Sequence, residues 1–178
     1  VSDILQRVDA PTRFDKDKAP ACIPSTYVAY DGRAHDAQRE RGAFAMLTGD
    51  IDTGNHEMEA VSDALRAVVG GEHLLAIYST ASSAPGNRKW RVLIPLAQPI
   101  PGELFSDVQS AFFAQMKKAG ITMDPALART AQVFYLPNVP LAGDEFPEPF
   151  ALHSRLPRRL AAARPPSRIE LPRRAVPV

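Results

Sequence analysis

The chain has 178 residues, of which 45% are hydrophobic, and a formal net charge of +1. This length suits one globular domain with its own core, and no apolar run reaches the roughly 20 residues that a membrane-spanning helix needs. The single cysteine, Cys22, excludes an intramolecular disulfide and a multi-cysteine zinc site, so we expect a cytoplasmic protein that makes no use of a membrane.

Charge is distributed unevenly along the chain. Seven arginines and one glutamate lie between Ser154 and Val178, together with five prolines, so this stretch carries a charge of +6 and the rest of the chain −5. Such a composition is typical of a flexible tail or linker. We therefore expect a folded domain at residues 1–150 and a Pro/Arg-rich tail or linker at residues 151–178. The acidic body is unlike a general electrostatic DNA binder.

The first half of the chain predicts one strand followed by one helix. Residues 1–40 contain prolines and charges that indicate turns, loops and one short helix. Residues 43–48 are mostly apolar and predict a strand. Beyond a turn at Thr53, apolar side chains recur at helical spacing up to Gly70, a plausible helix stop; they are Met58, Val61, Leu65 and Val68.

The second half predicts further strands and one longer helix. Residues 74–79, 90–95 and 132–136 are apolar runs with strand character. Pro101 is placed to start a helix that Gly120 would end, with an apolar face made of Leu104, Val108, Phe112 and Met116. The order of elements predicts an α+β fold, with a mixed or antiparallel sheet and flanking helices on one face.

Two carboxylates follow the first strand. Asp50 and Asp52 are two residues apart, so in a strand they point to the same side of the sheet. Adjacent carboxylates repel each other unless a cation lies between them, and Mg²⁺ is commonly bound by one or two carboxylates plus substrate phosphates. The pattern indicates a metal-dependent phosphoryl or nucleotidyl transfer site. The alternative is a strand that simply ends in a polar turn.

The hairpin after the second strand carries hydroxyl and basic side chains. Hydroxyls and backbone N–H groups in such a loop can cradle phosphate oxygens, and the basic groups can neutralise a triphosphate. The candidate nucleotide-binding residues are Ser79, Ser82, Ser83, Arg88, Lys89 and Arg91. A solvated hairpin with scattered charge is the alternative. Arg91 interrupts an apolar strand and needs a partner, which is either a phosphate or an acid at the edge of the core.

The order of these motifs resembles the archaeo-eukaryotic primase superfamily, in particular the primase-polymerase domains of phage and plasmid replication proteins. The first motif of that family is a strand with Asp-hydrophobic-Asp, matched here by Asp50 and Asp52. A serine-containing hairpin follows, matched by residues 79–83 and the string Lys-Trp-Arg-Val-Leu-Ile-Pro-Leu at 89–96. A third acid, Asp124, then precedes an Arg…Val-Phe-Tyr-Leu-Pro segment at 129–137.

The resemblance implies an RRM-like catalytic core that transfers nucleotides during DNA replication. By this resemblance, the catalytic carboxylates would be Asp50, Asp52 and Asp124, and they would hold Mg²⁺ or Mn²⁺ in a two-metal mechanism. Arg129 would contact single-stranded DNA as template. Nucleoside triphosphates would be the substrates, and a replicative helicase would be a further partner.

One departure from the family pattern leaves a second function open, and the carboxylates themselves leave a third. The histidine of the second motif, which helps to bind phosphates in the family, is absent, and Ala81 and Ser83 stand at the candidate positions. The second hypothesis is therefore a catalytically impaired primase-like module that binds single-stranded DNA or a replication partner. A metal-dependent nuclease would use the same carboxylates and is the third.

Overall fold

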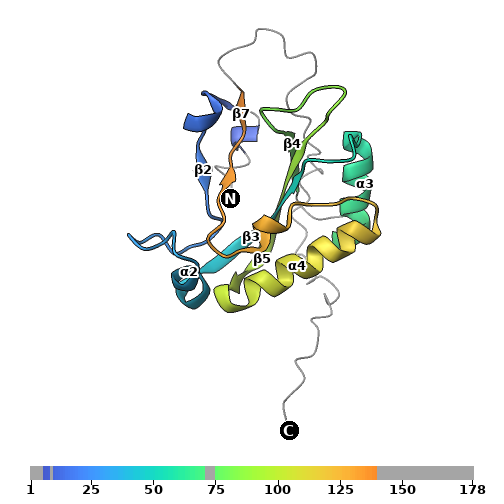
Figure 1. Cartoon of the computed structure of the whole chain (residues 1–178). Helices are drawn as coiled ribbons and strands as arrows, with labels where there is room; N and C mark the ends of the chain where they lie inside the picture. The colour runs from blue at the N-terminus through green and yellow to red at the C-terminus, as the bar shows by residue number, and fades with distance from the viewer. Residues whose placement is uncertain (1–5, 9, 71–74, 140–178) are drawn as a thin grey trace.

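The computed structural model describes residues 6–8, 10–70 and 75–139 (Figure 1). The domain boundary expected near residue 150 and the tail at 151–178 lie outside the described residues, as does Leu74 of the second expected strand. The main elements are β1 (Thr12–Arg13), η1 (Lys16–Lys18), β2 (Ala21–Cys22), α2 (His35–Arg41), β3 (Ala43–Ile51), α3 (Met58–Val69), β4 (Ala76–Ser79), β5 (Trp90–Pro101), α4 (Gly102–Lys118), η2 (Pro125–Ala128), β6 (Phe134–Tyr135) and β7 (Asn138–Val139).

The central sheet has three strands in the order β3-β5-β4, and β5 pairs antiparallel with both neighbours. Because β3 and β4 are both antiparallel to β5, they run in the same direction on either side of it. Helix α3 lies between them in the chain. Helix α4 follows β5 directly. The expected α+β class, with antiparallel sheets and flanking helices, is confirmed.

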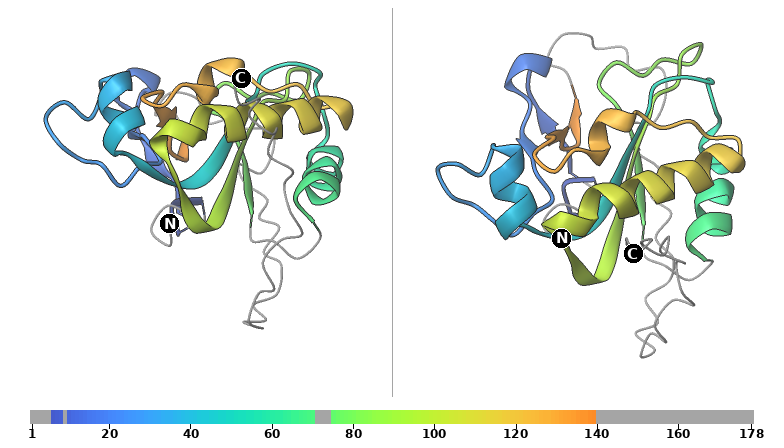
Figure 2. Two further views of the ribbon diagram at one scale, coloured as in Figure 1. Left: turned by 90° about the horizontal axis from the view of Figure 1, so that it is seen from below. Right: turned by 60° about the horizontal axis from the view of Figure 1, so that its bottom comes forward.

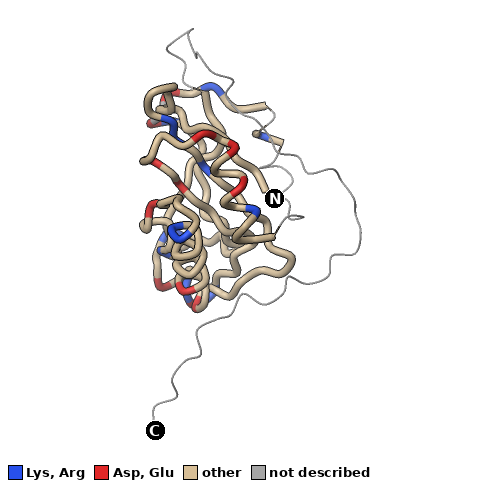
Figure 3. The backbone as a smooth tube through the Cα atoms, turned by 90° about the vertical axis from the view of Figure 1, so that its right-hand side faces the viewer, with Lys and Arg blue, Asp and Glu red and all other residues tan. Residues whose placement is uncertain are grey.

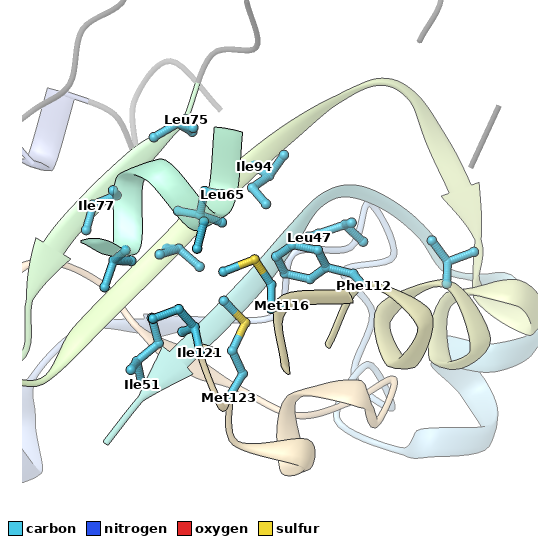
Figure 4. Packing of buried hydrophobic residues seen from close by; sticks show 14 of the residues in the cluster. Leu47, Ile51, Leu65, Leu75, Ile77, Ile94, Phe112, Met116, Ile121 and Met123 are labelled. Carbon is cyan, nitrogen blue, oxygen red and sulfur yellow. The ribbon is translucent and has the colours of Figure 1, made fainter. Parts of the chain in front are cut away.

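Helices α3 and α4 cover the same face of this sheet (Figure 2). Alternate residues of the strands, such as Leu47 and Ile94, meet the apolar stripes of both helices in one buried cluster (Figure 4). On α4 the expected stripe is wrong at one position, because Leu104 is 42% exposed and Phe105 is buried in its place. At 100° per residue Leu104 lies on the flank of the stripe, whereas Phe105 is centred on it and stacks on Phe44.

The opposite face of the sheet is covered by segments from both ends of the described chain. Strand β2 pairs with β6, and β1 pairs with β7, so two short sheets join the N-terminal segment to residues 134–139 (Figure 1). A second apolar cluster, which includes Leu93 and Phe134, lies beneath them. The strand expected at 132–136 is therefore shorter than expected and belongs to a separate small sheet.

The outer edge of β3 is protected along its length. Its first residues exchange backbone hydrogen bonds with Pro24 and Thr26, and in its middle the buried Gln109 side chain bonds both the N–H and the carbonyl oxygen of Thr48. Near its end the Asp124 N–H donates to the Asp50 carbonyl oxygen at 2.9 Å. An unpaired edge strand invites pairing with other chains, and these contacts remove that exposure.

The helix boundaries follow local signals. Helix α3 ends before Gly70, whose φ of 93° favours glycine, as the sequence predicts. Helix α4 begins at Gly102, directly after Pro101. None of the helices in the described ranges combines the length and the apolar character that crossing a bilayer would require.

We expect Gly102→Ala to destabilise the protein by about 1–3 kcal/mol, because α2 and α4 meet at this glycine. A Cβ there would clash with the Gln38 carbonyl oxygen and lie 2.7 Å from that of Arg39. These are backbone atoms that cannot move aside, so the clash outweighs the better helix propensity of alanine. Denaturant unfolding measures the change. Gly86→Ala is the control, since a Cβ at Gly86 meets nothing within 4 Å; equal stability of the two variants would contradict the prediction.

Candidate functional site

A pocket of about 230 Å³ opens where β3 ends and β5 begins, on the sheet face that α3 and α4 leave uncovered. The sheet supplies one wall, the hairpin after β4 a second, and the segment around β6 and β7 a third. The lining residues are Ala19, Asp50, Asp52, Tyr78, Ser79, Thr80, Ala81, Ser82, Lys89, Arg91, Tyr135, Leu136 and Asn138.

A row of three cross-strand neighbours forms the floor of the pocket. Asp50 on β3 and Tyr78 on β4 both stand opposite Arg91 on β5, so the three side chains share one face of the sheet. Arg91 donates from Nε and Nη2 to Asp50 Oδ2, at 3.3 and 3.1 Å. Both side chains of this ion pair are about 15% exposed. Arg91 thus has the acidic partner at the core edge that one of its two expected roles required.

The Arg91 guanidinium is also held from the third wall. Its Nη1 donates to the Tyr135 carbonyl oxygen at 3.1 Å, and its Cζ lies 5.3 Å from the centre of the Tyr135 ring. The Tyr78 hydroxyl donates to the same carbonyl oxygen at 2.8 Å. Burial raises the pKa of Tyr78, which keeps its phenol protonated and able to donate. These contacts connect the sheet to the segment that closes the pocket.

A second ion pair lies at the mouth of the pocket. Lys89 Nζ is 3.3 Å from Asp52 Oδ1, and the Asp52 side chain is 48% exposed. The neighbouring Arg88 turns the other way, because its Nη1 lies 3.1 Å from Glu57 Oε1 and its backbone N–H donates to Asn55 Oδ1. The loop after β3 and the hairpin before β5 are therefore connected by two ion pairs.

The pKa of the Asp50 carboxyl group is also shifted in the fold. Its pKa is raised, first because burial disfavours the charged carboxylate, and also because Asp52 and Asp124 lie near it. Arg91 acts in the opposite direction without cancelling these effects. A carboxyl group that burial and like charges both destabilise, inside a pocket, is typical of a functional site.

We expect the stability of the protein to fall, relative to Asp50→Asn, as the pH rises from the ordinary pKa of aspartate through the raised value in the fold. In that interval the folded state binds more protons than the unfolded state, so the contribution of Asp50 is present at lower pH and is lost above. Denaturant unfolding of both proteins across pH 4 to 8 measures the difference. If the wild type instead gained stability relative to Asp50→Asn as the pH rises, the pKa of Asp50 would be lowered in the fold and not raised.

The structure brings several of the expected nucleotide-binding residues together and separates others from the pocket. Ser79, Ser82, Lys89 and Arg91 line it. Ser83 lies within the hairpin, where its Oγ accepts the Lys89 N–H at 3.0 Å. Arg88 does not line the pocket, and its guanidinium group forms an ion pair with Glu57.

The expected carboxylates and the expected DNA contact are also partly separated. Asp50 and Asp52 both line the pocket, as their spacing predicts. The Asp124 carboxylate instead caps η2 by accepting the Ala126 N–H at 2.9 Å, and this exposed residue is outside the lining. Arg129 is exposed and donates to Gln132 Oε1 at 2.7 Å. The roles of Asp124 as a metal ligand and of Arg129 as a DNA contact stay predictions.

Four polar lining residues were not among the expected site residues, namely Tyr78, Thr80, Tyr135 and Asn138. Asn138 is buried and bonds both the N–H and the carbonyl oxygen of Phe14, which fixes the N-terminal segment beside the pocket. Tyr78 could have been found, because it directly precedes Ser79, an expected site residue, on the strand that leads into the hairpin. Asn138 follows a proline and carries no local signal of its role.

The carboxylates of the pocket suit a divalent cation that is also coordinated by oxygens of a bound substrate. Asp50 Oδ1 is buried and makes no hydrogen bond, so one carboxylate oxygen of the pocket has no partner. Across the described ranges, no three His, Cys, Asp or Glu side chains come together as a metal-binding group. Asp50 and Asp52 match the one or two carboxylates by which Mg²⁺ is usually held beside substrate phosphates.

Comparison with known protein families, with curated protein sequences and with solved structures finds no match for this chain.

Proposed function

We propose that the chain is a metal-dependent nucleotidyl transferase of the primase-polymerase type, with single-stranded DNA as template and nucleoside triphosphates as substrates. The observation that carries the proposal is the pocket itself. Two carboxylates, two basic groups and hairpin hydroxyls, from segments up to 41 positions apart in sequence, converge on about 230 Å³. Carboxylates for a divalent cation and cations for phosphates are the two kinds of group that phosphoryl-type transfer uses.

The topology supports the same proposal. The order β3-α3-β4-β5-α4, with β5 between β3 and β4, is the first five elements of a ferredoxin-like or RRM-like βαββαβ unit. The segment before Asp124 runs beside β3, where that arrangement has its last strand. The pocket lies on the sheet face that the helices leave free. In the proposed function, template and nucleotide would both approach Asp50 on this face of the sheet.

In the proposed mechanism each lining group has one task. Asp50 and Asp52 would hold Mg²⁺ or Mn²⁺, and the bound ion would supply the charge that activates a 3′-hydroxyl and stabilises pyrophosphate as it leaves. Lys89 and Arg91 would bind triphosphate oxygens, and the hydroxyls of Ser79 and Ser82 would orient them. Most of the rate enhancement would come from positioning and charge neutralisation.

A second candidate is the primase-like module without catalytic activity. The observations that favour it are the ion pairing of both lining carboxylates and the position of Asp124, whose carboxylate caps η2 outside the pocket. Such a module would bind single-stranded DNA or a replication partner and would not need a bound divalent cation.

A primer-synthesis and primer-extension assay on single-stranded DNA separates these functions. We expect labelled product to lengthen when deoxynucleoside or nucleoside triphosphates and Mg²⁺ or Mn²⁺ are both present, and to stop when EDTA removes the metal. Shortening of the DNA with the same metal dependence would indicate a nuclease. DNA binding with no extension under any metal or nucleotide condition would favour the non-catalytic module and reject the proposal.

A further inference from the structure

The basic side chains of the pocket are already bound to its acidic side chains. Lys89 lies 3.3 Å from Asp52, and Arg91 lies 3.1 Å from Asp50. All four line the pocket, and their formal charges sum to zero. Acidic and basic positions are likewise mixed along the described chain (Figure 3). The pocket therefore presents no single-sign field to an incoming ion.

These ion pairs compete with both ligands that the proposed reaction needs. A divalent cation that approaches alone meets Asp50 Oδ2, which already accepts two N–H groups of Arg91, and must remain close to two fixed positive charges. A triphosphate that approaches alone meets two carboxylates beside the cations that it would bind. Each ligand on its own would have to bind beside charges of its own sign, or break an ion pair and leave one member without a partner.

A cation and a triphosphate together can exchange partners with both pairs. The phosphate oxygens would bind Lys89 and Arg91, and the divalent cation would bind Asp50 and Asp52, so each of the four charged side chains would keep a partner of opposite sign. Asp50 Oδ1, buried and without a hydrogen bond, is the oxygen that gains most from a cation. With only two carboxylates in the lining, the ligand's oxygens would also complete the coordination of the cation.

We propose that Lys89 and Arg91 act as internal counter-ions of Asp52 and Asp50, so that a divalent cation and a nucleoside triphosphate bind this pocket cooperatively and each binds weakly alone. This inference rests on the proposed function. Cooperative coupling is reciprocal, so the nucleotide raises the affinity for the metal by the same factor as the metal raises the affinity for the nucleotide. The expected factor is roughly 10–100, within the common range for coupled sites.

Lys89→Met provides the test, because it keeps the length of the side chain and removes the charge beside Asp52. We expect Mn²⁺ alone to bind this variant several-fold more tightly than the wild type, measured by electron paramagnetic resonance of free Mn²⁺. Lys117→Met is the matched control, since Lys117 is an exposed residue of α4 outside the pocket lining. Thermal unfolding confirms that both variants are folded. Mn²⁺ affinity that is unchanged or lower in Lys89→Met would overturn the inference.

The second arm measures the coupling with a non-hydrolysable nucleoside triphosphate, with the Mn²⁺–nucleotide equilibrium in solution included in the analysis. We expect coupling of at least tenfold in the wild type and in Lys117→Met, and a clear reduction in Lys89→Met. Binding of both ligands to the wild type without coupling would overturn the inference and leave the proposed function standing. No binding of the nucleotide at any Mn²⁺ concentration would reject the proposed function, and the inference with it.

Discussion

Replacing Asp50 with asparagine should reduce primer extension by roughly 10²–10³-fold while the protein stays folded. The substitution keeps the shape of the side chain but removes the charge that a divalent cation would need. It also relieves a carboxylate whose pKa burial already raises, and the amide oxygen of asparagine can still accept from Arg91, so the fold loses little. The Arg91 guanidinium keeps its hydrogen bond to the Tyr135 carbonyl oxygen.

Two measurements check this result, the extension rate and the shift in melting temperature caused by millimolar Mn²⁺. Wild-type protein should be stabilised by Mn²⁺ through mass action, and Asp50→Asn should show no such shift. Asp63→Asn is the control, because Asp63 is an exposed aspartate of α3 outside the pocket lining. An Asp50→Asn protein that extends primers at the wild-type rate would exclude Asp50 from the catalytic machinery.

Arg91→Ala should lower the free energy of unfolding by about 2–4 kcal/mol, because it leaves the largely buried Asp50 carboxylate without its partner. The variant also loses the donor to the Tyr135 carbonyl oxygen and the contact with the Tyr135 ring. For a chain of this size the melting temperature should fall by roughly 5–12 °C. The sequence favoured a phosphate-binding role for Arg91, with little effect on stability, and left pairing with an acid at the core edge as the alternative. The ion pair with Asp50 adds a structural role.

The control for Arg91→Ala is Arg39→Ala, which breaks an exposed ion pair with Asp36. Exposed pairs contribute little, so this variant should be nearly as stable as the wild type. Combining Arg91→Ala with Asp50→Asn should recover part of the lost stability, because no unpaired buried charge remains. Full stability of Arg91→Ala would contradict the structural role. A loss of triphosphate affinity in folded protein, measured below the melting transition, reports the binding role separately.

Local patterns in the sequence were sufficient for much of the fold. The spacing of apolar residues between Met58 and Val68 predicts α3, and Gly70 ends it because glycine accepts a positive φ without strain. The spacing of Asp50 and Asp52 places both carboxylates on one side of the sheet. These features depend on residues within one helix or one strand, so no knowledge of distant segments is needed.

The sequence did not explain Gly49, which precedes Asp50. A Cβ at Gly49 would lie 2.7 Å from Met123 Sδ and from a methyl group of Val92, so the glycine makes room for the segment that returns from α4. That close approach brings the Asp124 N–H to the Asp50 carbonyl oxygen. The contact joins residues 74 positions apart, and nothing in either local pattern indicates it.

The sequence by itself determined the class of the fold, its main elements and the chemical character of the candidate site. Only the tertiary structure decided which charges meet. It paired Arg91 with Asp50 and Lys89 with Asp52, turned Arg88 to Glu57, and left Asp124 as a helix cap. The physical reason is the distance along the chain between the residues that decide each feature. Side-chain periodicity is set by neighbouring residues, whereas an ion pair depends on the register between strands and on the segments that fold over them.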